Sequence, residues 1–383
     1  MFSLSRRTFT LSFASSLAYV GFPKFGFANA TNQGKLVVII LEGGLDGLAA
    51  VPPIGDPQLL KYRRLLLPEN NIKIGSFFAL HPSFSGFVKM LAKGEASIIH
   101  ATSFPYTRRS HFEGQNVVES GSINPFVEKT GWLGRAMDIA GLSGRAMALD
   151  MPLLARGNVK VDNFFPANLK GSFDPTIDIT RSLSSYFGNA EAHKTIKRSI
   201  DGVERKYQNA PKFFSRDPAQ LALQAGKQMD KDDGPVAAII RVHDFDTHSN
   251  QGADSGQHAD QMRIVDDIFV NLKKGLGPSW KNSVALTLTE FGRTVRMNGS
   301  SGTDHGYGTV GLLAGGLLGK SSVVADWPDM KKLFEGRDLH ASIDYRAVCA
   351  ACIERAFLLD HKTIASKVFF DSNLKRISDQ IFV

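Results

Sequence analysis

Five short, predominantly apolar runs recur along the chain, and each is typical of a strand buried on both faces. They are rich in β-branched residues and lack the polar–apolar alternation of a half-exposed strand. The runs are KLVVIIL (35–41), ASIIHA (96–101), VAAIIRV (236–242), SVALTLT (283–289) and TVGLLAG (309–315). Nearly every run is followed by a polar loop, so we expect the strands to end there.

Longer segments between these runs carry apolar residues at helical spacing. They are residues 82–94, 110–121, 256–277 and 342–359. Strands that alternate with helices predict an α/β fold, with a mainly parallel central sheet and helices on both faces. Residues 157–232 are more polar and hold a further helical pattern around 182–208. We interpret them as an insertion or cap on a single domain that spans 31–383.

The beginning of the chain has the features of an export signal. Arg6 and Arg7 precede a weakly apolar, Ser/Ala-rich stretch that ends in Ala28-Asn29-Ala30. This order of charged region, apolar region and A-x-A site is typical of a signal peptide, and the paired arginines indicate twin-arginine export. We therefore expect residues 1–30 to be a signal, the twin-arginine machinery to be a partner, and the mature protein to be periplasmic or secreted. The apolar region is too short and polar for a stable membrane span.

Composition excludes several other classes. The chain has 383 residues, of which 43% are hydrophobic, enough for a sizeable core. Of its formal charge of +8, three units come from Arg6, Arg7 and Lys24, which leaves +5 on the remainder. Its basic residues form no run and no nucleic-acid module, so we expect no nucleic-acid partner. Cys349 and Cys352 sit one helical turn apart in an apolar pattern, which favours buried thiols over a redox motif.

The carboxyl ends of the strands form the binding edge of an open parallel sheet, so the loops after the runs are where chemistry is expected. SFPYTRRSHFEGQ (103–115) follows the second run. Ser110 and Glu113 fit a capping box that opens a helix. Ser110 is also a candidate nucleophile, since the positive end of the helix dipole favours anions there. Arg108 and Arg109 are placed to clamp a phosphate or sulfate group.

Two further loops carry carboxylates. LEGGLDGL (41–48) follows the first run and places Asp46 at the sheet edge, although an Asp-Gly pair is also typical of a plain turn. HDFDTHSNQG (243–252) follows the third run and holds Asp246 and His248. One residue separates these two side chains, so in an extended segment they can point to the same side.

TEFGRTVRMNGSSGTDHG (289–306) adds Glu290, Asp304 and His305 to the candidate ligands. Carboxylates and imidazoles that converge from separate strand ends are typical of a two-metal site, and they suit Zn or Mn. We expect one or two divalent ions. Arg293 either pairs with Glu290 or contacts substrate.

In combination the motifs resemble a known family. The export signal, GGLDGLAAVPP, LHPSF, SHFEGQ, GWLGRA, DTHSNQG, TEFGR and GTDHG occur in the order found in domain-of-unknown-function family 1501. That family is placed in the alkaline phosphatase and sulfatase superfamily. The resemblance implies an alkaline-phosphatase-like three-layer α/β sandwich with two metal positions at the strand ends. It also implies metal roles for Asp46, Asp246, His248, Glu290 and His305, and a nucleophile at Ser110.

These observations predict an exported, metal-dependent hydrolase of small phosphate or sulfate esters. Arg108, Arg109 and Arg293 would stabilise the charge that develops on the ester. The alternative is a non-catalytic envelope protein of the same fold that binds a ligand or a partner. A mutase-like or phosphonate-cleaving enzyme is a third, weaker interpretation. Glu290 stands where other branches of the superfamily carry an Asp-His pair, so the number of ions is left open.

Overall fold

The computed structural model describes residues 33–142, 146–147, 152–157 and 217–383. Residues Gln33–Val383 form one compact unit. The predicted signal (1–30), the predicted helix around 182–208 and most of the predicted insertion (157–232) lie outside the described residues. Within the described part, no helix is long and apolar enough to cross a membrane.

An eight-stranded sheet runs through the described part, in the order β10-β4-β8-β7-β1-β6-β5, with β9 paired to β4. Its strands are β1 (Lys35–Leu41), β4 (Ala96–Ser103), β5 (Ala146–Met147), β6 (Ala237–Val242), β7 (Ser283–Thr289), β8 (Thr309–Ala314), β9 (Val323–Ala325) and β10 (Ile343–Asp344). A separate antiparallel pair consists of β2 (Ile72–Ile74) and β3 (Phe78–Leu80).

The helices are α2 (Gly47–Ala50), α3 (Leu59–Arg63), α4 (Ser85–Leu91), α5 (His111–Ser120), α6 (Trp132–Ile139), α9 (Pro218–Met229), α10 (Gln257–Leu276), α11 (Tyr345–Phe357), α12 (His361–Thr363) and α13 (Ser378–Ile381). Short 3-10 or π turns lie at Arg64–Leu66, Leu153–Ala155, Gly277–Asn282, Gly316–Leu318 and Ile364–Val368.

The prediction of a mainly parallel sheet is confirmed. β1 pairs in parallel with β6 and with β7, and β4 pairs in parallel with β9 and β10. β8 is the exception, because it runs antiparallel to both β4 and β7. The loop from β7 to β8 contains no helix, so the chain returns beside β7 in the opposite direction instead of crossing over as a parallel connection must.

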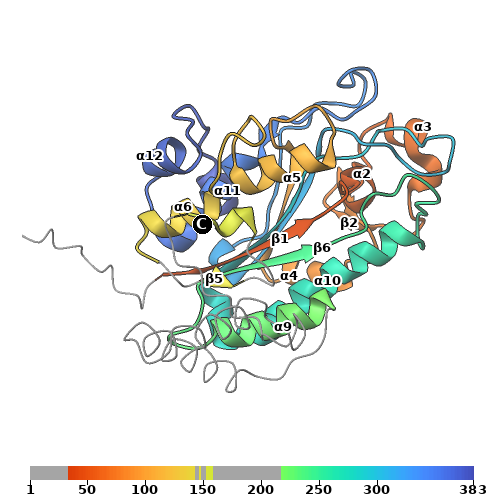
Figure 1. The fold of residues 1–383 in the computed structure, drawn as a ribbon. Coiled ribbons are helices and arrows are strands. Elements are labelled where there is room, and N and C mark those ends of the chain that lie inside the picture. Colours follow the sequence, from red (N-terminus) through yellow and green to blue (C-terminus); the bar gives the residue numbers. More distant parts are fainter. Residues whose placement is uncertain (1–32, 143–145, 148–151, 158–216) are drawn as a thin grey trace, which may run out of the picture. The chain divides into compact units, whose positions relative to one another are not determined.

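Helices cover both faces of the sheet, as a three-layer sandwich requires (Figure 1). Alternate residues of β1 serve the two cores, since successive side chains of a strand point to opposite faces. Leu36, Val38 and Ile40 pack with residues of α5, α6 and α11. Val37, Ile39 and Leu41 pack with residues of α4, α9 and α10. This double burial explains why the strands are continuous apolar runs.

The last part of the predicted insertion contains a helix that packs on the core. α9 begins after the N-cap Asp217 and buries its apolar face in the same core as α10.

The two cysteines are structural. Cys349 and Cys352 are free and fully buried on α11, and burial raises the pKa of both thiols. A thiol with a raised pKa is a poor nucleophile, so these cysteines pack the helix.

We expect His100 in β4 to make the fold sensitive to acid. Its buried ring bonds the carbonyl of Val51 at 2.8 Å, and burial lowers its pKa to about 4. Between the unfolded pKa near 6.5 and this value the unfolded chain binds the extra proton, so stability falls as the pH drops through that window. We expect metal-free wild-type protein to lose about 2 kcal/mol more between pH 7 and pH 5 than His100→Gln does. Urea unfolding at both pH values measures this, and parallel losses would contradict it.

Candidate metal centre

The candidate centre lies where parallel strands end side by side. Leu41 at the end of β1 is in register with Val242 of β6 and with Thr289 of β7. The loops that follow β6 and β7 therefore begin at one edge of the sheet. The amino end of α5 reaches the same edge after β4, which has the same direction as β7 because both are antiparallel to β8.

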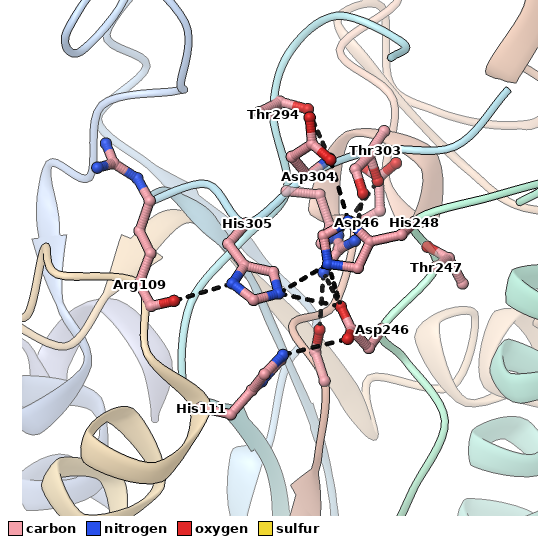
Figure 2. A network of polar contacts seen from close by, with 12 residues as sticks. Asp46, Arg109, His111, Asp246, Thr247, His248, Thr294, Thr303, Asp304 and His305 are labelled. Carbon is pink, nitrogen blue, oxygen red and sulfur yellow. Dashed lines mark hydrogen bonds and ion pairs between the residues drawn. The ribbon is translucent and has the colours of Figure 1, made fainter. Parts of the chain in front are cut away.

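Three histidines surround Asp246 at this edge (Figure 2). The coordinating atoms of His111, Asp246 and His305 all lie within 4.8 Å of one another. Asp246 Oδ1 is 3.1 Å from Nε2 of His305 and 3.1 Å from Nε2 of His248. Asp246 Oδ2 is 3.3 Å from Nε2 of His111. The two Nε2 atoms of His248 and His305 are themselves only 3.0 Å apart.

Each of these histidines has its other ring nitrogen beside a fixed acceptor. Nδ1 of His111 is 2.8 Å from Glu290 Oε1, Nδ1 of His248 is 3.0 Å from Asp304 Oδ1, and Nδ1 of His305 is 2.8 Å from the carbonyl oxygen of Arg109. These acceptors favour a proton on Nδ1, which leaves the Nε2 lone pair free to bind a metal. With Nδ1 protonated, the Nε2 atoms of His248 and His305 cannot bond each other, because neither is a donor.

A buried nitrogen without a hydrogen bond and access from solvent fit a bound cation at this centre. His111 Nε2 is buried and makes no satisfactory hydrogen bond. A hydrogen bond to Glu290 raises the pKa of His111, whereas burial lowers the pKa of His305. The side chains of Asp246 and His248 are 39% and 46% exposed, so an ion or small molecule can reach them from solvent. The residues present thus fit a divalent ion.

Arg293 contacts this cluster through Asp246. Its buried guanidinium donates to Asp246 Oδ1 at 2.6 Å and to the carbonyl of Gly43 at 3.0 Å. Burial raises the pKa of Asp246, but the hydrogen bond and charge of Arg293 together with His111 and His248 outweigh burial, and the net pKa is lowered. Of the two roles left open by the sequence, the structure therefore has Arg293 paired with a carboxylate, but with Asp246 and not with Glu290.

Glu290 and Asp304 lie beside the cluster and act on its histidines. Glu290 is buried and also accepts from the backbone N–H of Gly43 at 2.8 Å. Asp304 accepts from Asn298 as well as from His248. In this arrangement each carboxylate orients a histidine through Nδ1, and neither belongs to the group of atoms that meet at Asp246.

Asp46 is not brought into the cluster. Its carboxylate is fully buried, where it pairs with Arg63 and accepts from Gln251 Nε2 at 2.6 Å and from the backbone N–H of Ala49. Burial raises the pKa of Asp46, but Arg63, His258 and the hydrogen bond from Gln251 together outweigh burial, and the net pKa is lowered. With both oxygens engaged, this side chain fastens α2 to its surroundings.

The other predicted residues lie around the start of α5. Ser110 is the N-cap residue, yet its hydroxyl makes no capping bond, and Glu113 bonds the Tyr106 hydroxyl instead of closing a capping box. Arg108 is 60% exposed and pairs with Glu113. Arg109 is held by Asp338 and Glu335, so its guanidinium is not free for a clamp.

His111 is the one member of the cluster that the sequence did not single out. It directly follows Ser110 in the motif SHFEGQ, so it was next to a residue already considered. A histidine at the first turn of a helix has many ordinary roles. Only the approach of the α5 terminus to the loops after β6 and β7 reveals that it meets Asp246.

The fold and the site define an α/β sandwich protein with a candidate His/Asp metal centre at its strand ends. Residues 190–355 match the model of the family described as protein of unknown function (DUF1501). Over this part of the chain, the match confirms the family that the motifs indicated. A comparison with curated proteins gives no match.

Solved structures with a similar fold are distant in sequence. One is the C-terminal periplasmic domain of EcEptC from Escherichia coli in complex with Zn, with 12% identity, a TM-score of 0.40, and coverage of 91% of this chain and 89% of that chain. Another is the PsFucS1 sulfatase from Pseudoalteromonas sp., with 12% identity, a TM-score of 0.39, and coverage of 98% and 79%. The alkaline phosphatase from the Antarctic bacterium TAB5 has 10% identity, a TM-score of 0.32, and coverage of 76% and 95%. Likenesses at this level do not extend to activity or ligands.

Proposed function

We propose that His111, Asp246, His248 and His305 bind one divalent metal ion. The supporting observation is that three Nε2 atoms lie around one carboxylate while every Nδ1 faces an acceptor. Three imidazoles and one carboxylate are a ligand set typical of Zn, and Mn is the second candidate. Among the described residues, only His111, Asp246 and His305 form a group whose ligand atoms all lie within 4.8 Å of one another, and His248 adjoins this group through Asp246, so we propose one ion and not two.

We further propose that the protein is an exported hydrolase of phosphate or sulfate esters. A bound divalent ion would polarise the ester oxygen in such a reaction. The chain would add Ser110 as nucleophile at the start of α5, next to His111, and the exposed Arg108 as a contact for the anionic group. The family resemblance supports this reaction class, and the partial exposure of Asp246 and His248 supports access by a small substrate.

One observation favours the non-catalytic alternative. Four protein ligands complete a tetrahedral site, as in structural zinc centres, whereas catalytic centres usually leave one position for water or substrate. Arg293 donates a hydrogen bond to Asp246 Oδ1 and so competes with the metal for that oxygen. The number of protein ligands therefore depends on whether Asp246 binds the ion through Oδ1 or Oδ2. In the alternative the ion would be bound without turnover, and the protein would serve as a binding module of the envelope.

A panel of chromogenic phosphate and sulfate esters distinguishes the two functions. Metal-loaded wild-type protein should hydrolyse at least one ester, and chelation or His248→Ala should abolish the activity. His243→Ala is a matched control, because this exposed histidine of the same loop bonds Glu42 and not Asp246. A wild-type protein that holds its metal but cleaves no ester would support the binding module.

The role of Ser110 can be tested separately from folding. Because its hydroxyl makes no capping bond, Ser110→Ala should leave the melting temperature within a few degrees of wild type. Loss of a nucleophile should nevertheless lower kcat by several orders of magnitude. Ester hydrolysis and thermal unfolding measure the two effects. Retained activity would transfer the nucleophile's role to water.

Export through the twin-arginine pathway is proposed from Arg6, Arg7 and the A-x-A site. We expect cleavage after Ala30 and accumulation of the full-length precursor in the cytoplasm when Arg6→Lys and Arg7→Lys are combined. Fractionation of cells that express wild type and the double variant measures this. Equal amounts of mature protein in the periplasm would refute the pathway.

A further inference from the structure

The backbone of Arg109 is strained at the point where it contacts the candidate centre. Its φ is 60°, in the left-handed region that residues other than glycine rarely adopt. In this conformation its carbonyl oxygen lies 2.8 Å from Nδ1 of His305 (Figure 2). This carbonyl is the only acceptor among the three Nδ1 partners that is not a carboxylate, so its direction depends on the backbone of Arg109.

A buried carboxylate fixes the side chain of the same residue. Asp338 is fully buried, and its Oδ2 accepts from Arg109 Nε at 2.9 Å and from Arg109 Nη2 at 2.7 Å. Its Oδ1 accepts from Arg337 Nε at 3.0 Å. The guanidinium of Arg337 in turn donates to the backbone carbonyl of His305. Asp338 therefore reaches His305 along two routes, one to its ring and one to its backbone.

We propose that Asp338 is a positioning residue for His305 and acts through Arg109 and Arg337. This proposal rests on the proposed function, in which His305 binds the metal. Replacing the acceptor of a metal-binding histidine typically weakens metal binding by about 10–100-fold, because ring orientation and tautomer are no longer fixed. Asp338 would have this effect from outside the cluster, because it holds the strained residue that carries the acceptor.

The loop that carries Asp338 is itself well anchored. Phe334 and Asp338 exchange two backbone bonds, of 2.8 and 3.0 Å. The backbone N–H of Val295 donates to the carbonyl of Arg337 at 3.0 Å. Glu335 binds Arg109 Nη2 at 2.6 Å but is half exposed, and it contributes little because exposed pairs are weak. The buried Asp338 is thus the member of this loop whose loss should disturb Arg109 most.

The first test needs no metal. In metal-free protein with isotope-labelled histidine, the ¹⁵N shifts of His305 should report a proton held on Nδ1. Asp338→Asn and Arg109→Gly should both shift this signal towards a mixture of tautomers. Glycine adopts a positive φ without strain, so Arg109→Gly removes the side-chain anchor while the backbone conformation stays allowed. A His305 signal that is unchanged in Asp338→Asn would overturn the proposal.

The second test measures metal affinity and separates the two proposals. Competition with a chelator for Co²⁺ should give a Kd about 10–100-fold weaker for Asp338→Asn than for wild type, with an altered Co²⁺ absorption spectrum. Asp344→Asn is the matched control, because it perturbs a similar Arg–Asp pair, with Arg346, that touches none of the four histidine and aspartate ligands. A wild-type protein that binds no metal would refute the proposed function, while the ¹⁵N signal would still decide the role of Asp338.

Discussion

Replacing His111 by alanine is expected to remove the bound ion from the purified protein. Wild-type protein should retain about one divalent ion per chain after dialysis, as a four-ligand site does. His111→Ala deletes an Nε2 atom that is buried and poised 3.3 Å from Asp246 Oδ2, and water in its place cannot restore the affinity. Elemental mass spectrometry measures the content, and His243→Ala serves as the control. An unchanged metal content in His111→Ala would refute the centre.

Replacing the neighbouring carboxylates Glu290 and Asp304 should weaken metal binding less than His111→Ala does. If Glu290 and Asp304 only orient His111 and His248, then Glu290→Gln and Asp304→Asn should weaken metal binding by roughly 10–100-fold, as outer partners do, without abolishing it. If either carboxylate binds the ion directly, as its position in the sequence suggested, its amide variant should resemble His111→Ala. Titration of the metal-free variants distinguishes these outcomes.

Replacing Asp46 by asparagine is expected to destabilise the protein strongly while its metal content stays the same. The fully buried Arg63 would lose its counter-charge, and an uncompensated buried charge typically costs about 3–5 kcal/mol. Asparagine keeps the cap of α2, so the loss can be assigned to the ion pair. Denaturant unfolding measures the stability, and mass spectrometry of the folded variant measures the metal.

A double variant strengthens this prediction. Removing both charges, in Asp46→Leu with Arg63→Met, should recover part of the stability that Asp46→Asn loses, because apolar pairs often replace buried ion pairs at little cost. The opposite pattern, with normal stability and no bound metal in Asp46→Asn, would make Asp46 a ligand. It would then support the two-metal site expected from the sequence.

Much of the fold was predictable because a strand that is buried on both faces has a continuous apolar sequence. KLVVIIL and SVALTLT are continuous apolar runs for this reason, and both are central strands of the sheet. The direction of β8 was not predictable, because TVGLLAG is equally apolar in either direction. Only its pairing with β4 and β7 made it antiparallel.

For helix α5 the boundary was predictable from the sequence, but the hydrogen bonds of its cap were not. The start of α5 at His111 follows from the sequence, since a serine precedes an amphipathic segment. The expected reciprocal bonds of Ser110 and Glu113 do not form, because Glu113 accepts from Tyr106 and pairs with Arg108. A local sequence pattern shows which partners are near in the chain, but it does not show that other residues will bind the same side chain in the folded protein.

The sequence by itself determined the strands β1, β4, β6, β7 and β8, the helices α4, α5, α10 and α11, and the residue types in the polar loops, because hydrophobic periodicity and strand ends are local properties. The tertiary structure decided which of those side chains meet. His111 lies beside Asp246, and Asp46 forms a buried ion pair with Arg63. Glu290 and Asp304 bond the Nδ1 atoms of His111 and His248. Carboxylates that bind a metal and carboxylates that orient a histidine are the same residue type. What separates them is a few ångströms between atoms far apart in the chain, and only the packed fold supplies that distance.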